Sequence, residues 1–311
     1  KRIMSDREIG CLLSGGLDSS LITGLVAKEY NGRGLNTFSI GMEGSVALVY
    51  AKEVADFLGT KHHQIELTQK DFLKAIETVI YNIESYDTTT VRASVGNYLV
   101  SKYISENSDC KVIFNGDGAD EVCCGYVYLK NAPSPGALQI ESERLVKEIY
   151  LFDVLRSDRS ISSNGLEART PFLDKAFVKY YLSIHPELKQ FDGEKRLEKY
   201  LLRKAFEGMG VIPDSVLWRR KCAFSDGVSS QKTSWHTIVQ SFVDQQISDE
   251  EFSKEIKLIK HCTPVLKESY YYRKVYKSFF GKHDNLIPKF WMPQWTDVID
   301  PSARELSGYK E

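Results

Sequence analysis

The sequence lacks several features that would define a class of protein at once. It has almost no surplus charge, because 41 Lys and Arg residues face 42 Asp and Glu residues, so a strongly basic surface for nucleic acid is excluded. No apolar run approaches the roughly 18 residues that span a bilayer. The first residues are not those of a secretory signal. We therefore expect a cytoplasmic protein that binds neither nucleic acid nor membranes.

The six cysteines also lack the spacing of a metal site or a disulfide framework. They form no CxxC pair, and the adjacent Cys123 and Cys124 have a poor geometry for a disulfide. The six histidines are scattered, so we do not expect a zinc site. Buried, reduced thiols in a reducing compartment are the expected arrangement. The chain does not begin with Met, which indicates a processed chain or a fragment.

Short apolar runs alternate with segments of helical period in the first half of the chain. This alternation predicts a parallel sheet with right-handed crossovers. We expect strands at residues 9–13, 36–40, 62–67 and 111–114, and helices from Leu17, over about 47–58, from Thr68 or Gln69, and over 93–104. Glycine turns at 14–16 and 116–118 follow the first and fourth strands, at the edge where such sheets bind ligands.

The second half, from residue 137, is predicted to be largely helical. The turn-forming residues 133–136 separate it from the first half, so we expect an α/β core at 1–136 and a helical part at 137–311 that completes the site. Further helices are expected between Pro171 and Pro186 and around 197–206. The spacing of Leu145, Ile149, Phe152 and Leu155 predicts one face of a single helix. The region past Lys221 is polar and is expected to be rich in loops.

Residues 14–20, Ser-Gly-Gly-Leu-Asp-Ser-Ser, join the first strand to the first helix. Their glycines, hydroxyl groups and free helix N–H groups suit an anion. The segment is neither a Walker A loop nor a GxGxxG fingerprint, since both patterns are absent from it. Asp18 would repel a phosphate by itself, so it indicates Mg²⁺ that bridges to phosphates. The alternative is a plain strand–turn–helix in which Asp18 caps the helix.

This segment is the pyrophosphate-binding motif of the PP-loop (N-type) ATP pyrophosphatases, an adenine nucleotide alpha hydrolase-like α/β fold that the chain resembles. From about residue 9 to the end, the chain also resembles the synthetase domain of glutamine-dependent asparagine synthetase, because further sequence blocks match that domain in the same order. These blocks are TTTVRAS at 88–94, GDGADE at 116–121, EARTPFLD at 167–174, Lys221 with FSDG at 224–227, FWMP at 290–293 and DPSAR at 300–304.

The resemblance implies a site for ATP and Mg²⁺. The residues that it assigns to ATP are Leu12, Ser14, Gly15, Gly16, Asp18, Ser19, Ser20, Ile40, Asn115 and Gly116. It assigns Mg²⁺ to Asp18 and Asp120. Asp120 could instead cap a helix or form a salt bridge, and Leu12 and Ile40 could simply belong to the core.

The resemblance also implies four catalytic residues, Asp117, Lys221, Arg92 and Asp153. Lys221 would lie near the α-phosphate and stabilise developing charge. Its alternative is a solvated place in the Arg219–Lys221 charge run. Arg92 would lie near the substrate or phosphates. Asp153 and Arg156 could instead form a surface ion pair one helical turn apart.

The implied reaction is ATP-dependent: the side-chain carboxylate of aspartate becomes β-aspartyl-AMP, pyrophosphate leaves, and ammonia then forms asparagine and AMP. Asp117 departs from the usual Glu of the family and Asn115 from the usual Ser, whereas β-lactam synthetases carry Tyr at position 117. A shorter side chain could misplace the charge, and such shifts can cost about 100-fold in rate.

The N-terminal glutaminase domain of the family is absent from this sequence. Ammonia would come from solution, a separate chain or a removed domain, and a homodimer is a further expected partner. The competing interpretations are a PP-loop ligase with another acceptor, such as a β-lactam synthetase-like enzyme, and a catalytically weak nucleotide-binding regulatory chain.

Overall fold

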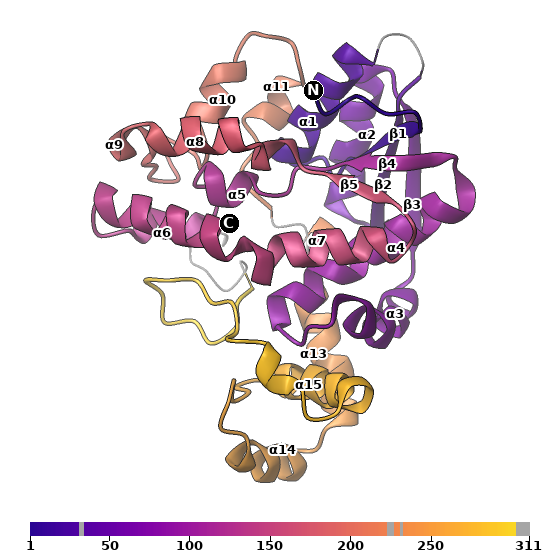
Figure 1. The fold of residues 1–311 in the computed structure, drawn as a ribbon, viewed down its shortest axis with the longest axis vertical. Coiled ribbons are helices and arrows are strands. Elements are labelled where there is room, and N and C mark those ends of the chain that lie inside the picture. Colours follow the sequence, from indigo (N-terminus) through magenta and orange to yellow (C-terminus); the bar gives the residue numbers. More distant parts are fainter. Residues whose placement is uncertain (31–33, 223–226, 231–232, 303–311) are drawn as a thin grey trace.

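A parallel five-stranded sheet carries the site (Figure 1). The computed structural model describes residues 1–30, 34–222, 227–230 and 233–302. The strands are β1 (Glu8–Leu12), β2 (Asn36–Met42), β3 (Lys61–Leu67), β4 (Cys110–Phe114) and β5 (Glu167–Arg169), in the order β3-β2-β1-β4-β5. The central β1 pairs with β2 on one side and β4 on the other, so the chain reverses its direction of winding between β1 and β4. A crevice for ligands is expected at that point.

The α/β fold class is confirmed, and the four expected strands are present with bounds shifted by one or two residues. The fifth strand was not predicted. β5 has only three residues, two of them charged, so its sequence carries no apolar alternation. It comes from the second half of the chain and pairs in parallel with β4. The sheet therefore draws on both sides of residue 136, and the division of the chain there stays a prediction.

Helices fill the connections between strands and most of the second half. In the first half they are α1 (Leu17–Glu29), α2 (Val46–Leu58), α3 (Gln69–Ile83), α4 (Thr88–Asn107) and α5 (Ala119–Val122). In the second half they are α6 (Pro135–Glu148), α7 (Asp153–Ser162), α8 (Lys175–Ser183), α9 (Pro186–Lys189), α10 (Tyr200–Phe206), α11 (Asp214–Leu217), α13 (Trp235–Gln246), α14 (Asp249–Glu255) and α15 (Lys267–Phe280). The longest, α4, begins five residues before the expected start, because Asp87 caps it by accepting from the Thr90 N–H at 2.9 Å.

Both faces of the sheet are buried, as expected for parallel strands. On one face Cys11 and Phe114 pack against α1 and α2 in one hydrophobic cluster. On the other, Phe38 and Ile113 pack against α3 and α4 in a second cluster, which also includes residues of α13 and α15. With its two faces covered, the sheet leaves its edge, where strands end, as the place for a ligand.

The expected single helix over Leu145–Leu155 is wrong. Helix α6 ends at Glu148, a 3-10 turn follows, and Phe152 leaves the helical conformation with φ −130° and ψ −93°. Phe152 is buried with Tyr128 in a separate small cluster. The packing of this one side chain outweighs the helical pattern, and α7 restarts at Asp153.

The expectation of a loop-rich region past Lys221 is confirmed only in part: α13, α14 and α15 lie there, but residues 281–302 hold only one 3-10 turn, Asp284–Leu286. These three helices gather at one end of the molecule in Figure 1, and α13 and α15 pack on α3. Serines at positions 234 and 248 cap α13 and α14, a polar start that resembles a loop in the sequence. Four of the six cysteines are buried, as expected. In the described part of the chain, no helix has both the length and the apolarity needed to cross a membrane.

Candidate functional site

Two glycine turns meet at the carboxyl ends of β1 and β4 and form the floor of a pocket. A Cβ atom on Gly116 would lie 2.7 Å from the backbone nitrogen of Ser19, and one on Gly15 would lie 2.5 Å from that of Ala51. Gly15 also has a φ of +69°, which favours glycine. Both glycines are therefore required by close backbone approach, and the coincidence of turns expected from the sequence is confirmed.

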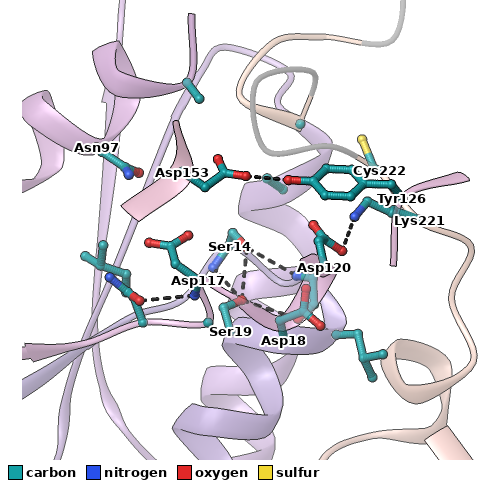
Figure 2. A pocket seen from close by; sticks show the side chains of 18 of the residues that line it. Ser14, Asp18, Ser19, Asn97, Asp117, Asp120, Tyr126, Asp153, Lys221 and Cys222 are labelled. Carbon is teal, nitrogen blue, oxygen red and sulfur yellow. Dashed lines mark hydrogen bonds and ion pairs between the residues drawn. The ribbon is translucent and has the colours of Figure 1, made fainter. Parts of the chain in front are cut away.

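The phosphate-loop side of the pocket is a cradle of hydroxyl and N–H groups (Figure 2). The Ser14 and Ser19 hydroxyls lie 2.9 Å apart, and the Ser14 N–H donates to Ser19 Oγ at 3.2 Å. Helix α1 begins at Leu17 with Gly16 as its N-cap residue and with no side-chain cap. The alternative interpretation of Asp18 as a helix cap is therefore wrong. The free N–H groups at the start of α1 suit an anion.

Lys199 is a residue of the site that the sequence analysis missed. Its ammonium group pairs with Asp18 and lies 2.6 Å from Asp120 Oδ1, and its side chain is 3% exposed. Burial lowers the Lys199 pKa, but the two carboxylates outweigh this effect and raise it above the usual value. A single lysine in a charge-rich segment carries no sequence signature, so only the fold reveals its place between the two aspartates predicted to bind Mg²⁺.

Gly125 leaves the space that Lys199 needs. A Cβ atom at position 125 would lie 2.0 Å from Lys199 Cε and 2.1 Å from Asp120 Oδ1. The backbone of Lys199 itself has a φ of +58°, a left-handed conformation that is uncommon for a residue with a side chain. The surroundings therefore fix this ammonium group in one position.

A second lysine, Lys221, also pairs with Asp120, and its Nζ lies 5.0 Å from the centre of the Tyr126 ring (Figure 2). Its side chain is 12% exposed. The alternative of a solvated charge run is therefore wrong for this residue, while the salt-bridge alternative for Asp120 does occur. Burial raises the Asp120 pKa, but Lys199 and Lys221 outweigh it and hold this pKa well below its usual value. Asp120 is a carboxylate at neutral pH.

The opposite side of the pocket carries a group that we call the acidic cluster: Asp117, Glu121, Tyr126, Asp153 and Arg156. The Tyr126 hydroxyl lies within hydrogen-bond distance of two acceptors, Glu121 Oε1 (2.8 Å) and Asp153 Oδ2, and can donate its one hydrogen to either. Arg156 binds Asp153 at 2.5 Å and Asp117 at 3.2 Å. Their side chains are at most 20% exposed, so the alternative of a surface ion pair is wrong.

The acidic cluster separates the protonation states of its carboxyl groups. Burial, with the neighbouring Asp153 charge, raises the Glu121 pKa well above its usual value. Burial raises the Asp153 pKa too, but the Arg156 charge and a hydrogen bond from Glu121 bring it below its usual value. The two pKa values shift in opposite directions, which favours a proton on Glu121 and a charge on Asp153, as expected for two carboxyls that share a site.

Arg92 lines the pocket, but its guanidinium group pairs with carboxylates of other elements. Its guanidinium binds both Glu268 oxygens, at 2.8 Å and 2.5 Å, and both Asp300 oxygens, at 2.7 Å and 2.8 Å, with 4% of the side chain exposed. Its own carbonyl accepts from the Trp235 indole at 3.1 Å. These contacts join α4 to α13, α15 and the end of the described chain, and the predicted place of Arg92 beside substrate stays a prediction.

The remaining predicted nucleotide residues also gather here. Leu12, Ile40, Asn115 and Gly116 line the pocket, and Ile40 also belongs to the hydrophobic core, while the contact of these residues with a nucleotide stays a prediction. Buried oxygens of three side chains, Asp18 Oδ1, Ser20 Oγ and Thr89 Oγ1, have no hydrogen-bond partner in the described residues. Residues 224–226 and 303–304 of the predicted blocks lie outside the described residues.

The fold and site define a class: a PP-loop α/β domain with a nucleotide-type cradle beside a buried cluster of acids. The comparisons with known proteins agree with this class. The Asparagine synthase family matches residues 1–139 and 130–299. The chain belongs to this family.

Curated relatives cover the whole chain. Asparagine synthetase [glutamine-hydrolyzing] from Rattus norvegicus is 48% identical over 315 residues, that from Gallus gallus 48% over 314 and that from Homo sapiens 47% over 314. The chain spans 56% of the length of each of these relatives. A solved structure of a predicted subunit of a tRNA methyltransferase from Methanocaldococcus jannaschii matches 57% of this chain and 74% of its own, at 18% identity and a TM-score of 0.31.

Proposed function

We propose that this chain carries out ATP-dependent asparagine synthesis. One observation supports this most: a phosphate cradle and a buried acidic cluster share a single pocket, with lysines between them. Family membership supports the same activity, since the relatives are named asparagine synthetases. A carboxylate at position 117, rather than the Tyr of β-lactam synthetases, supports aspartate as the acceptor.

The first half of the proposed reaction joins aspartate to AMP. A β-carboxylate oxygen attacks the α-phosphorus, the bond from that phosphorus to the bridging oxygen breaks, and pyrophosphate leaves. Ser14, Ser19 and the first N–H groups of α1 hold phosphate oxygens. The Lys221 ammonium stabilises the charge that develops on them.

The acidic cluster suits the α-ammonium and α-carboxylate groups of an amino-acid substrate. Asp153 is ionised and suits an α-ammonium group, while the Arg156 guanidinium suits a carboxylate. In the second half of the reaction the nitrogen of ammonia attacks the acyl carbon, AMP leaves, and a proton must be accepted. Asp117 lies at this side of the pocket, where a carboxylate could position the ammonia (Figure 2).

Mg²⁺ is part of this proposal, and the residues present suit it. Asp18 and Asp120 both reach Lys199, so one cation contacts both, and Asp18 Oδ1 is buried without a partner in the described residues. Mg²⁺ is commonly held by one or two carboxylates together with substrate phosphates. When bound, the ion would neutralise phosphate charge. The proposal also includes a cytoplasmic setting, a glutaminase domain or chain as ammonia donor, and a homodimer.

The test is pyrophosphate release with Mg-ATP, aspartate and ammonium, with amino-acid products analysed in parallel. We expect pyrophosphate and asparagine in equal amounts, and neither product when aspartate is omitted. Pyrophosphate release with a different acceptor would instead indicate another ligase of the class. ATP binding with no pyrophosphate under any acceptor would indicate a regulatory chain.

A further inference from the structure

We propose that Asn115 and Ser157 are positioning residues that hold the short Asp117 carboxylate in its working place. The inference rests on the proposed function, and it names two side chains that do not need to touch the substrate. Asn115 follows β4, and Ser157 lies on α7, 42 positions further along the chain. The fold brings both against the residue that departs from the family pattern.

The Asn115 amide joins these elements through both of its polar ends. Its Oδ1 accepts from the Asp117 N–H at 3.1 Å, and its Nδ2 donates to Ser157 Oγ at 2.9 Å. A backbone N–H can only donate, so the orientation of the amide is fixed by this contact. The exposed fractions are 4% for Asn115 and 2% for Ser157, so water does not compete for either group.

Ser157, held by Asn115, in turn restricts the position of the Asp117 side chain. Its oxygen already accepts from Asn115, which leaves its one O–H free to donate, and the Ser157 hydroxyl lowers the pKa of the nearby Asp117 carboxyl group. Two hydrogen bonds of Asn115, to the Asp117 N–H and to Ser157, together with the Ser157 hydroxyl beside the Asp117 carboxylate, therefore link the three residues in a ring. Burial raises the Asp117 pKa, while Arg156 and Ser157 oppose that rise, which agrees with contacts made to the charged carboxylate.

The ring connects the two departures from the family pattern, Asp117 in place of Glu and Asn115 in place of Ser. The Asp117 side chain is one methylene shorter than the usual Glu, so its carboxylate reaches less far. Asn115 has a longer side chain than the usual Ser, with one hydrogen-bond acceptor and one donor group. Both changes fall within three residues of one turn. A shift of about 1 Å at such a group can cost about 100-fold in rate, so a side chain that fixes Asp117 has a measurable effect without any contact to substrate.

The experiment compares Ser157→Ala with Ser160→Ala. Both serines are buried on α7, but the Ser160 hydroxyl has no hydrogen-bond partner in the described residues, so its removal controls for the loss of one oxygen in this helix. We expect Ser157→Ala to lower kcat for asparagine about 10- to 100-fold. The affinity for ATP and the melting temperature should match those of Ser160→Ala. Asn115→Ser should lower kcat as well, and because Asn115 is also predicted to lie beside ATP, the ATP affinity of this second variant is measured with its kcat.

A double-mutant cycle then tests the coupling to Asp117. In the Asp117→Glu variant the longer side chain no longer depends on the ring, so adding Ser157→Ala should cost less than threefold, against the loss of about tenfold or more in the unchanged protein. Equal kcat for Ser157→Ala and Ser160→Ala would overturn the inference, and so would equal losses with Asp and Glu at position 117. If the unchanged protein makes no asparagine, the proposed function has failed instead, and the two failures are thereby distinguished.

Discussion

The two sides of the pocket are built in opposite ways. The phosphate side is formed by seven consecutive residues, 14–20, and the groups predicted to bind phosphate are mostly backbone N–H groups and hydroxyls at the start of α1. The acidic cluster takes its five residues from the turn after β4, from α5 and the segment that follows it, and from α7. The phosphate side is thus one continuous segment with a single charged residue, Asp18. The acidic cluster is brought together from separate segments, and four of its five residues are carboxylic acids or the base Arg156.

This difference shows where each side gets its precision. The phosphate loop is fixed by local backbone geometry, such as the left-handed Gly15, and needs few partners. The acidic cluster is fixed by mutual ion pairs among buried groups, so each member depends on the others. Asp18 and Asp120, joined by Lys199, connect the two sides. Changes at that connection should therefore have the largest effects.

Asp18→Asn should be the most damaging change. It keeps the shape of the side chain but removes the charge next to the phosphate cradle, and with it the proposed Mg²⁺ contact. A loss of about 4 kcal/mol of transition-state stabilisation, or about a thousandfold in pyrophosphate release, is expected. Steady-state kinetics over a range of Mg²⁺ concentrations would measure it. Activity within tenfold of the unchanged protein, at equal Mg²⁺, would remove Asp18 from the metal site.

Lys199→Met should come next, and its first effect is on stability. It leaves Asp18 without its cation and Asp120 with Lys221 alone, and because these carboxylates are 22% and 26% exposed, we expect a cost of about 1–3 kcal/mol. Urea unfolding without Mg²⁺ measures this. Lys204→Met is the control on the same helix, because that side chain is 45% exposed and its loss should change the stability by less than about 0.5 kcal/mol.

Mg²⁺ should then restore part of the lost stability, because a divalent cation between Asp18 and Asp120 replaces the missing charge. The rise in melting temperature on adding Mg²⁺ should be larger for Lys199→Met than for the unchanged protein. Equal rises in the two proteins would mean that the ion binds elsewhere.

The same contrast explains how much of the molecule could be predicted from its sequence. The phosphate loop, four strands and the glycine turns could be predicted, because a turn of backbone and an apolar run are properties of neighbouring residues. Lys199 could not, since its position depends on ion pairs with Asp18 of α1 and Asp120 of α5, which are far away in the sequence. Asp153 was predicted from the family resemblance rather than from a sequence pattern, and the structure places it in the acidic cluster.

The misses have the same physical origin. Strand β5 is held by the backbone pairing of β4, so its own residues need no strand pattern. The break at Phe152 follows from tertiary packing of one aromatic ring, which a helical period cannot reveal. The carboxylate partners of Arg92, Glu268 and Asp300, lie 176 and 208 positions further along the chain, so the sequence could not reveal these ion pairs, and the place of Arg92 beside substrate stays a prediction.

Gly116→Ala should have an intermediate effect, because it tests the contact between the two glycine turns. The new Cβ would meet the backbone of Asp18 and Ser19 at 2.8 Å and 2.7 Å, so the phosphate loop must move. Overpacking of this kind costs about 1–3 kcal/mol, and we expect ATP affinity to fall by about tenfold. Gly136→Ala is the control, since its nearest neighbour would be 3.8 Å away. Equal ATP affinities in a direct binding titration would show that the two turns are not in the contact described.

Glu121→Gln should have the smallest effect on activity, although it changes a member of the acidic cluster. Glu121 is held protonated, and an amide of the same size can still donate to Asp153, so activity should fall by less than about tenfold. Asp153→Asn removes the ionised member and should cost more.

Stability against pH gives an independent measurement of the state of Glu121. A raised pKa means that the folded protein keeps a proton that the unfolded chain releases above pH 4.5, so folding becomes less favourable as the pH rises. Glu121→Gln has no such proton. It should therefore gain stability relative to the unchanged protein as the pH is raised above that value. If the difference between the two unfolding free energies stays constant with pH, Glu121 is ionised, and the acidic cluster then holds a further negative charge that Arg156 alone must balance.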